Sequence, residues 1–108
     1  IFDDLGESPA GSHCKGIEGL IGECDEILEM TTNPEVRDAA LISAAQRIEH
    51  YEIAGYGTVR SYAKQLGHDF AASKLKETLD QESKTDKELT KIAEGTLFTG
   101  GVNEEAAS

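Results

Sequence analysis

Two long stretches of helical periodicity, separated by one short break, limit what this chain can fold into. In each stretch a stripe of mostly apolar residues recurs in alternating steps of three and four, the spacing that keeps side chains on one face of an α-helix. The first stripe runs Ile42, Ala45, Glu49, Glu52, Tyr56, Val59, Ala63, and the second runs Leu75, Leu79, Glu82, Asp86, Leu89, Ala93. Each stripe therefore carries two acidic residues at positions that otherwise suit a core.

Local signals predict three helices, over about residues 14–30, 34–66 and 70–97. Asn33 and Pro34 are typical of the cap and the first position of a helix, and Gly67 is typical of a helix end. Residues 98–108 are small and polar, so we expect a disordered tail there. The sequence predicts an all-α fold in one small domain, residues 1–97.

The acidic residues of the two stripes are expected to lie at the same depth of a helical hairpin. A turn just after Gly67 makes the last two predicted helices antiparallel neighbours. Glu49 and Glu52 precede that turn along the chain, and at 1.5 Å of rise per residue they lie about 25 Å from it. Glu82 and Asp86 follow it at the same separation, about 25 Å. Because neighbouring carboxylates cannot all stay ionised without a compensating charge, a cation with oxygen ligands, such as iron or manganese, is predicted between them.

Two nearby residues are candidates for supporting roles. His50 follows Glu49 but lies about 100° around the helix, which favours a place behind the ligands, or on the surface, over direct metal binding. Tyr56 lies one turn beyond Glu52 and either donates a hydrogen bond to a carboxylate or fills the core. A different explanation of the acids is pairing with basic residues, in a non-enzymatic scaffold or oligomerisation module without metal. The available partners are Arg47, Arg60, Lys64 and Lys84.

The charge balance excludes some classes of partner. The chain has 21 Asp and Glu against 10 Lys and Arg, a formal net charge of −11, which argues against binding nucleic acid or an anionic membrane through a basic surface. No apolar run approaches the roughly 20 residues of a membrane span, and no signal-peptide pattern is visible.

Cys14 and Cys24 lie about 15 Å apart on one predicted helix, too far for a disulfide. Reduced cysteines are typical of a cytoplasmic protein.

Three segments of the chain carry a family resemblance. They read CKGIEGLIGE (14–23), RDAALISAAQRIEHYEIAGY (37–56) and LKETLDQESKTDKEL (75–89). They resemble the YciE/YciF family of ferritin-like bacterial stress proteins, and the match covers about residues 5–95. The resemblance implies a ferritin-like four-helix bundle with a carboxylate-bridged site for two iron ions, manganese being the alternative. Glu49 and Glu52 match acids of the third bundle helix, and Glu82 and Asp86 match those of the fourth.

The chain departs from this family in its N-terminal part. The family begins with two long helices that bring further ligands, whereas here residues 1–5 resemble only the last turn of the second. We therefore expect either N-terminal helices that this sequence lacks, or a second copy in a homodimer, to complete the bundle and its metal site. The resemblance also implies a stress-related role with iron or peroxide redox chemistry, without naming a reaction or a substrate.

Overall fold

Among the residues that the computed structural model describes, three helices are long and one is short. The structure describes residues 1, 5–8, 11, 14–30, 33–95 and 100–107. Within these residues the elements in order are α2 (Lys15–Met30), α3 (Pro34–Gln65), α4 (Asp69–Glu94) and α5 (Val102–Ala107). The all-α prediction is confirmed. Among the described residues, no helix combines the length and the apolar character that a membrane crossing requires.

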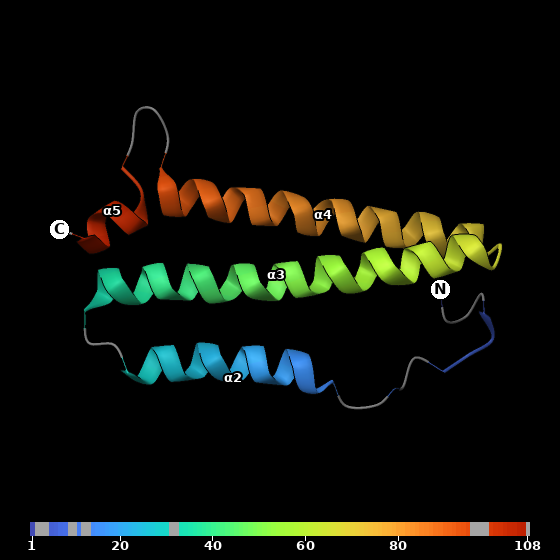
Figure 1. Cartoon of the computed structure of the whole chain (residues 1–108), viewed down its shortest axis with the longest axis horizontal. Helices are drawn as coiled ribbons and strands as arrows, with labels where there is room; N and C mark the ends of the chain where they lie inside the picture. Colours follow the sequence, from blue (N-terminus) through green and yellow to red (C-terminus); the bar gives the residue numbers. More distant parts are fainter. Residues whose placement is uncertain (2–4, 9–10, 12–13, 31–32, 96–99, 108) are drawn as a thin grey trace.

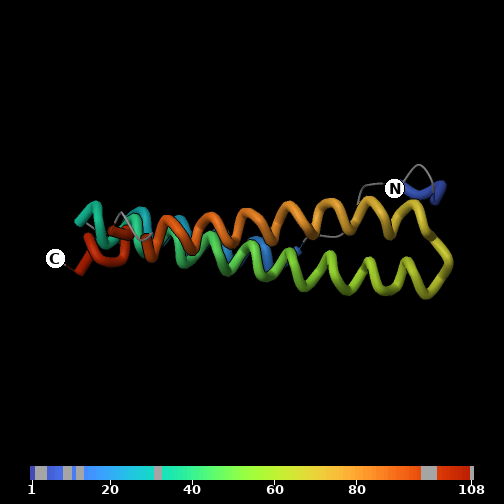
Figure 2. The backbone as a smooth tube through the Cα atoms, turned by 90° about the horizontal axis from the view of Figure 1, so that it is seen from above, coloured from blue at the N-terminus to red at the C-terminus, as the bar shows by residue number. Residues whose placement is uncertain are grey.

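The long helices lie beside one another, with α3 between α2 and α4 (Figure 1). The helices α3 and α4 form an antiparallel hairpin, and Figure 2 shows the turn that joins them at one end of the molecule. Asn33 starts α3, because its side-chain oxygen accepts the backbone N–H groups of Glu35 at 2.9 Å and Val36 at 3.2 Å. Gly67, at φ +77°, ends the last turn of this helix and lets the chain reverse into α4.

The contact between α3 and α4 is built from small side chains. The buried hydrophobic residues described are Ala44, Ala63, Ala71, Ala72, Leu75 and Ala93. Because alanine has only a methyl group, the two helix backbones approach closely and leave little room for larger core residues. Several large apolar side chains are exposed instead, among them Val59, Tyr62 and Leu66. The hairpin therefore has one well-packed seam and an apolar face that none of the described residues fully covers.

The end of the chain differs from the sequence expectation. The last predicted helix extended to residue 97, but α4 ends at Glu94, where Gly95 takes a φ of +86°; residues 96 and 97 lie outside the described part. The tail 98–108 was predicted to be disordered, yet within it the structure places α5 against α3 and α4. Gly101 explains this contact, since a Cβ there would collide with the backbone of Ala93 and Glu94. Only glycine lets the chain turn back so closely.

Candidate metal centre

Three of the four predicted ligands meet between α3 and α4. Glu49, Glu52 and Glu82 each place one carboxylate oxygen within 4.8 Å of the others. Glu49 and Glu52 share a helix face because they lie three residues apart on α3, and the antiparallel hairpin brings Glu82 of α4 to the same level. All three residues are half-buried. The structure thus joins the glutamates of both apolar stripes in one group.

Two carboxyl groups of this cluster, those of Glu52 and Glu82, have raised pKa values. Burial is the main cause that raises the pKa of Glu52, followed by a hydrogen bond with Glu82 and the charge of Glu82. A hydrogen bond with Glu49 is the main cause that raises the pKa of Glu82, followed by burial, while a hydrogen bond with Glu52 acts in the opposite direction. Two carboxyl groups can share a hydrogen bond only if one of them holds a proton. Without a cation Glu52 and Glu82 therefore retain protons to a higher pH than free glutamates do.

One oxygen of the cluster has no compensating partner in the described part of the chain. Glu49 Oε2 is buried and accepts no hydrogen bond there. A buried polar atom left in this state costs about 1–3 kcal/mol. No Lys or Arg nitrogen of the described residues lies within 4.0 Å of the three glutamates. The cluster therefore contains only oxygen donors, which is the ligand type that hard cations prefer.

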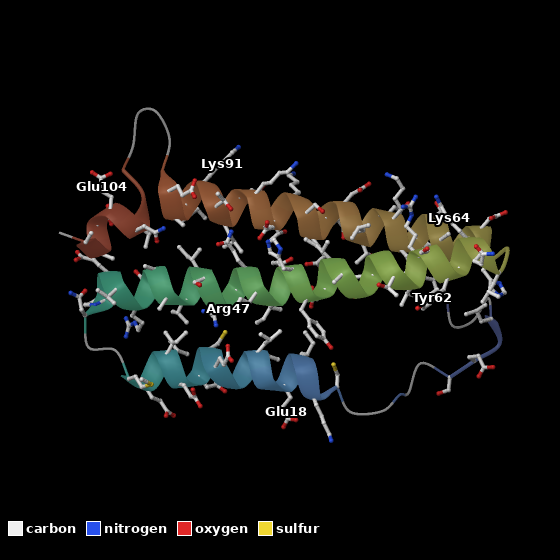
Figure 3. All side chains as sticks on the ribbon, viewed as in Figure 1. Glu18, Arg47, Tyr62, Lys64, Lys91 and Glu104 are labelled. Atoms are coloured by element: carbon white, nitrogen blue, oxygen red, sulfur yellow. The ribbon has the colours of Figure 1, made fainter. Side chains whose placement is uncertain are left out.

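The basic residues considered as partners of these acids do not pair with them in the described part of the structure. Arg47 Nη1 lies 3.0 Å from Glu23 Oε2 of α2, and Figure 3 shows its side chain extending from α3 towards α2. Lys64, also labelled there, lies near the turn that joins α3 to α4 (Figure 3). Neither these residues nor Arg60 and Lys84 form an ion pair with the glutamate cluster in the described part of the structure.

Asp86, the fourth predicted ligand, faces different neighbours. Its Oδ1 lies 3.0 Å from His50 Nε2 and accepts a longer hydrogen bond, 3.4 Å, from Gln46 Nε2. The same Gln46 amide donates to Thr90 Oγ1 at 2.7 Å. His50 therefore contacts a predicted ligand, while Asp86 does not join the three glutamates. Sequence reasoning missed Gln46, although its position one turn before His50 places both on the side of α3 that meets α4.

Tyr56 lies on apolar residues. It packs against the buried cluster of Ala63, Ala71, Ala72 and Leu75. The same side chain lines a groove of about 590 Å³ that opens beside Glu52. A smaller hollow of about 220 Å³ shares Val59 and Leu75 with this groove and continues along α3 towards Leu66. We call the residues that line either hollow the open face, namely Ile1, Leu5, Ile17, Tyr51, Glu52, Gly55, Tyr56, Val59, Tyr62, Ala63, Leu66, His68, Ala71, Leu75 and Thr78. The open face reaches the glutamate cluster through Glu52.

Comparison with known proteins identifies relatives along nearly the whole chain. The profile of the family described as "Domain of unknown function (DUF892)" matches residues 1–107. Protein YciF of Escherichia coli strain K12 is 58% identical over 80 residues, which cover 74% of this chain and 48% of YciF. The crystal structure of the E. coli stress protein YciF matches with a TM-score of 0.76 and 52% identity, covering 80% of this chain and 54% of that one.

A second solved structure supports the same relationship. YcfI from Rhodopseudomonas palustris matches with a TM-score of 0.82 and 41% identity, covering 85% of this chain and 59% of that one. The chain thus spans about half the length of the relatives that it matches. The sequence resemblance is confirmed, and the chain belongs to the DUF892 family, the family of YciF-type proteins.

Proposed function

We propose that the α3–α4 hairpin supplies the carboxylate ligands of a metal centre, with Glu49, Glu52 and Glu82 as the residues that hold the metal. The observation that carries this proposal is the convergence of three carboxylate oxygens from two helices within 4.8 Å. Groups that consist of oxygen donors alone suit iron(II), manganese(II) and other hard or borderline cations better than copper(I), which prefers sulfur.

The state of the cluster without a cation supports the proposal. Burial and mutual contact raise the pKa values of Glu52 and Glu82, and Glu49 Oε2 is buried without a partner in the described residues. A cation would satisfy the Glu49 oxygen and replace the protons on its neighbours. One ion thus removes two unfavourable features of the metal-free protein.

The family resemblance extends the proposal to two iron ions, with manganese as the alternative. Bound iron would supply redox chemistry with O₂ or peroxide, because anionic oxygen ligands stabilise Fe(III) more than Fe(II). Asp86 would serve as a further ligand or hold His50 in place at the edge of the site. One relative of known structure, YciF of E. coli, is described as a stress protein, and we propose a stress-related role here. The free cysteines Cys14 and Cys24 support a reducing, cytoplasmic location.

Titration of the EDTA-treated protein with Mn(II), followed by calorimetry, tests the ligand assignment. We expect binding by the unmodified chain and its loss in the double variant Glu49→Gln/Glu82→Gln, since an amide replaces two of the three anionic ligands. Glu88→Gln is the matched control, because Glu88 is also on α4 but is exposed. Equal Mn(II) affinity in the double variant and the control would show that the cluster is not the site.

The alternative function is a non-enzymatic helical scaffold in which acids pair across helices. Two contacts favour it: His50 with Asp86, and Arg47 with Glu23. Metal analysis of freshly purified protein distinguishes the two functions, followed by anaerobic Fe(II) loading and addition of O₂. The scaffold predicts that neither bound metal nor an oxidation signal is found. The metal centre predicts bound metal and a signal from the oxidation of Fe(II).

A further inference from the structure

Gln46 of α3 is fixed against α4 by a closed set of hydrogen bonds. Its side-chain Nε2 donates to Thr90 Oγ1 at 2.7 Å, and the Thr90 hydroxyl donates to the backbone oxygen of Asp86 at 3.2 Å. Because a hydroxyl has only one hydrogen to donate, Thr90 can only accept from Gln46. The nitrogen of the Gln46 amide, and not its oxygen, therefore faces α4.

The same amide nitrogen reaches the side chain of Asp86. Gln46 Nε2 lies 3.4 Å from the backbone oxygen of Asp86 and 3.4 Å from its Oδ1, which makes each of these contacts weaker than the bond to Thr90. His50 Nε2 lies 3.0 Å from the same Oδ1. Two donors from α3 thus converge on one carboxylate oxygen of α4.

These donors hold a carboxylate that stands next to the proposed metal centre. Asp86 lies four residues after Glu82, so their Cβ atoms are neighbours on one face of α4, about 5–6 Å apart. A change of χ1 rotamer can move the Asp86 carboxylate along that face. In the structure, however, the carboxylates that converge within 4.8 Å are those of Glu49, Glu52 and Glu82, and Asp86 is held apart from them.

We propose that Gln46 is a positioning residue that retains Asp86 outside the glutamate cluster and thereby lowers the metal affinity of the site. The inference rests on the proposed function and concerns the regulation of the same site. Asp86 must leave its donors before it can bind a cation, so the apparent affinity falls with the fraction of molecules in which Asp86 is released. Gln46 is the firmer of the two donors, because Thr90 anchors it, whereas the side chain of His50 is 66% exposed.

Calorimetric titration of the EDTA-treated full chain with Mn(II) tests this role. Loss of a residue that orients a metal ligand usually weakens metal binding by about 10–100-fold. For Gln46→Met, which keeps the length of the side chain but cannot donate a hydrogen bond, we expect the opposite sign. Mn(II) binding should strengthen by about threefold or more, because Asp86 is released more often. The urea concentration at the midpoint of unfolding should fall at the same time, since the bond to Thr90 is lost.

Two further variants separate retention of Asp86 from a general effect on the fold. Thr90→Val removes the anchor of Gln46 but keeps the shape of the side chain, and it should also strengthen Mn(II) binding. Gln81→Met is the matched control, because Gln81 lies on α4 with an exposed side chain; its Mn(II) affinity should equal that of the unmodified chain. A Gln46 that only stabilised the fold would lower stability and Mn(II) affinity together when it is replaced.

A double-mutant cycle connects the effect to Asp86. Asp86→Asn should cost more Mn(II) affinity in the Gln46→Met background than in the unmodified chain, because the released carboxylate is the one that reaches the cation. Unchanged or weaker binding by Gln46→Met, or equal costs of Asp86→Asn in both backgrounds, would overturn the inference and leave the metal centre in place. If the unmodified chain does not bind Mn(II), the proposed function fails and the inference fails with it.

Discussion

His50 Nε2 lies 3.0 Å from Asp86 Oδ1, which joins α3 to α4 one turn from the glutamate cluster. The side chain of Asp86 is 18% exposed and that of His50 is 66% exposed, so the carboxylate is at the inner end of the contact. Gln46 reaches the same oxygen from the preceding turn of α3. The acids of α4 thus have different surroundings: Glu82 meets other carboxyl groups, whereas Asp86 already has hydrogen-bond donors.

This difference predicts unequal effects on metal binding. Asp86→Asn should weaken Mn(II) binding by less than about tenfold, because the Asp86 carboxylate already has His50 and Gln46 as partners. Glu82→Gln should weaken Mn(II) binding by about 100-fold or more. Calorimetric titration of both variants measures the comparison, and urea unfolding corrects for any change in stability. Equal losses of Mn(II) affinity in the two variants would show that Asp86 contributes as much to metal binding as Glu82.

The raised pKa values predict how the metal-free protein responds to pH. The folded state keeps protons on Glu52 and Glu82 above the ordinary glutamate value of 4.5, and so binds more protons than the unfolded chain there. The free energy of unfolding must therefore fall as the pH rises from that value through the raised pKa values. The stabilisation is fully present below the unfolded pKa and lost above the folded one.

Urea unfolding in EDTA, from about pH 5 to about pH 8, measures this slope. Glu82→Gln should make the slope shallower and raise the stability near neutral pH, because the amide removes one charge from the crowded cluster. Glu88→Gln, on the exposed side of α4, should keep the slope of the unmodified chain. An unchanged slope in Glu82→Gln would show that the cluster does not control the pH response.

Sequence reasoning located features that depend on spacing along one helix. Asn33 and Gly67 mark the two ends of the long helix α3 by local backbone chemistry, and the stripes single out the glutamates because face and depth follow from residue number. The contact between His50 and Asp86 depends instead on how far each helix is rotated about its own axis. Packing of the alanine seam sets that rotation, so spacing along either helix alone does not predict it.

Gly101 illustrates a second feature that spacing does not reveal. A missing Cβ matters only through what it would touch, here the backbone of Ala93 and Glu94. Gly101→Ala should therefore release α5 from the hairpin and destabilise the protein by about 1–3 kcal/mol. Hydrogen exchange of the backbone amides in 102–107 measures the release. Unchanged protection there would show that the chain accommodates the methyl group without losing the contact.

The same substitution should have the opposite effect at Gly57. This residue lies inside α3, where an added Cβ meets nothing within 4 Å. Gly57→Ala should raise the free energy of unfolding by about 1 kcal/mol, because alanine has the higher helix propensity. Urea unfolding at one pH compares it directly with Gly101→Ala. A loss of stability in Gly57→Ala would reveal a contact that the single chain does not make.

The start of α2 offers a prediction that is independent of metal. Cys14 Sγ lies 3.3 Å from the hydroxyl of Tyr51, whose ring lies so close to Gly16 that a Cβ there would collide with it. The hydrogen bond with Tyr51 is the main cause that lowers the pKa of the Cys14 thiol, followed by the backbone N–H of Ile17. The same contact raises the pKa of the Tyr51 hydroxyl.

Tyr51→Phe should therefore slow the alkylation of Cys14 by iodoacetamide. The phenyl ring keeps the packing on Gly16 but cannot donate a hydrogen bond to the Cys14 thiolate. At a pH below the pKa of the Cys14 thiol, less of the reactive thiolate is therefore present. Peptide mass spectrometry follows the rate, with Cys24 in the same chain as the internal reference. If the rate at Cys14 relative to Cys24 is the same in both proteins, the backbone N–H groups at the start of α2 stabilise the thiolate without help from Tyr51.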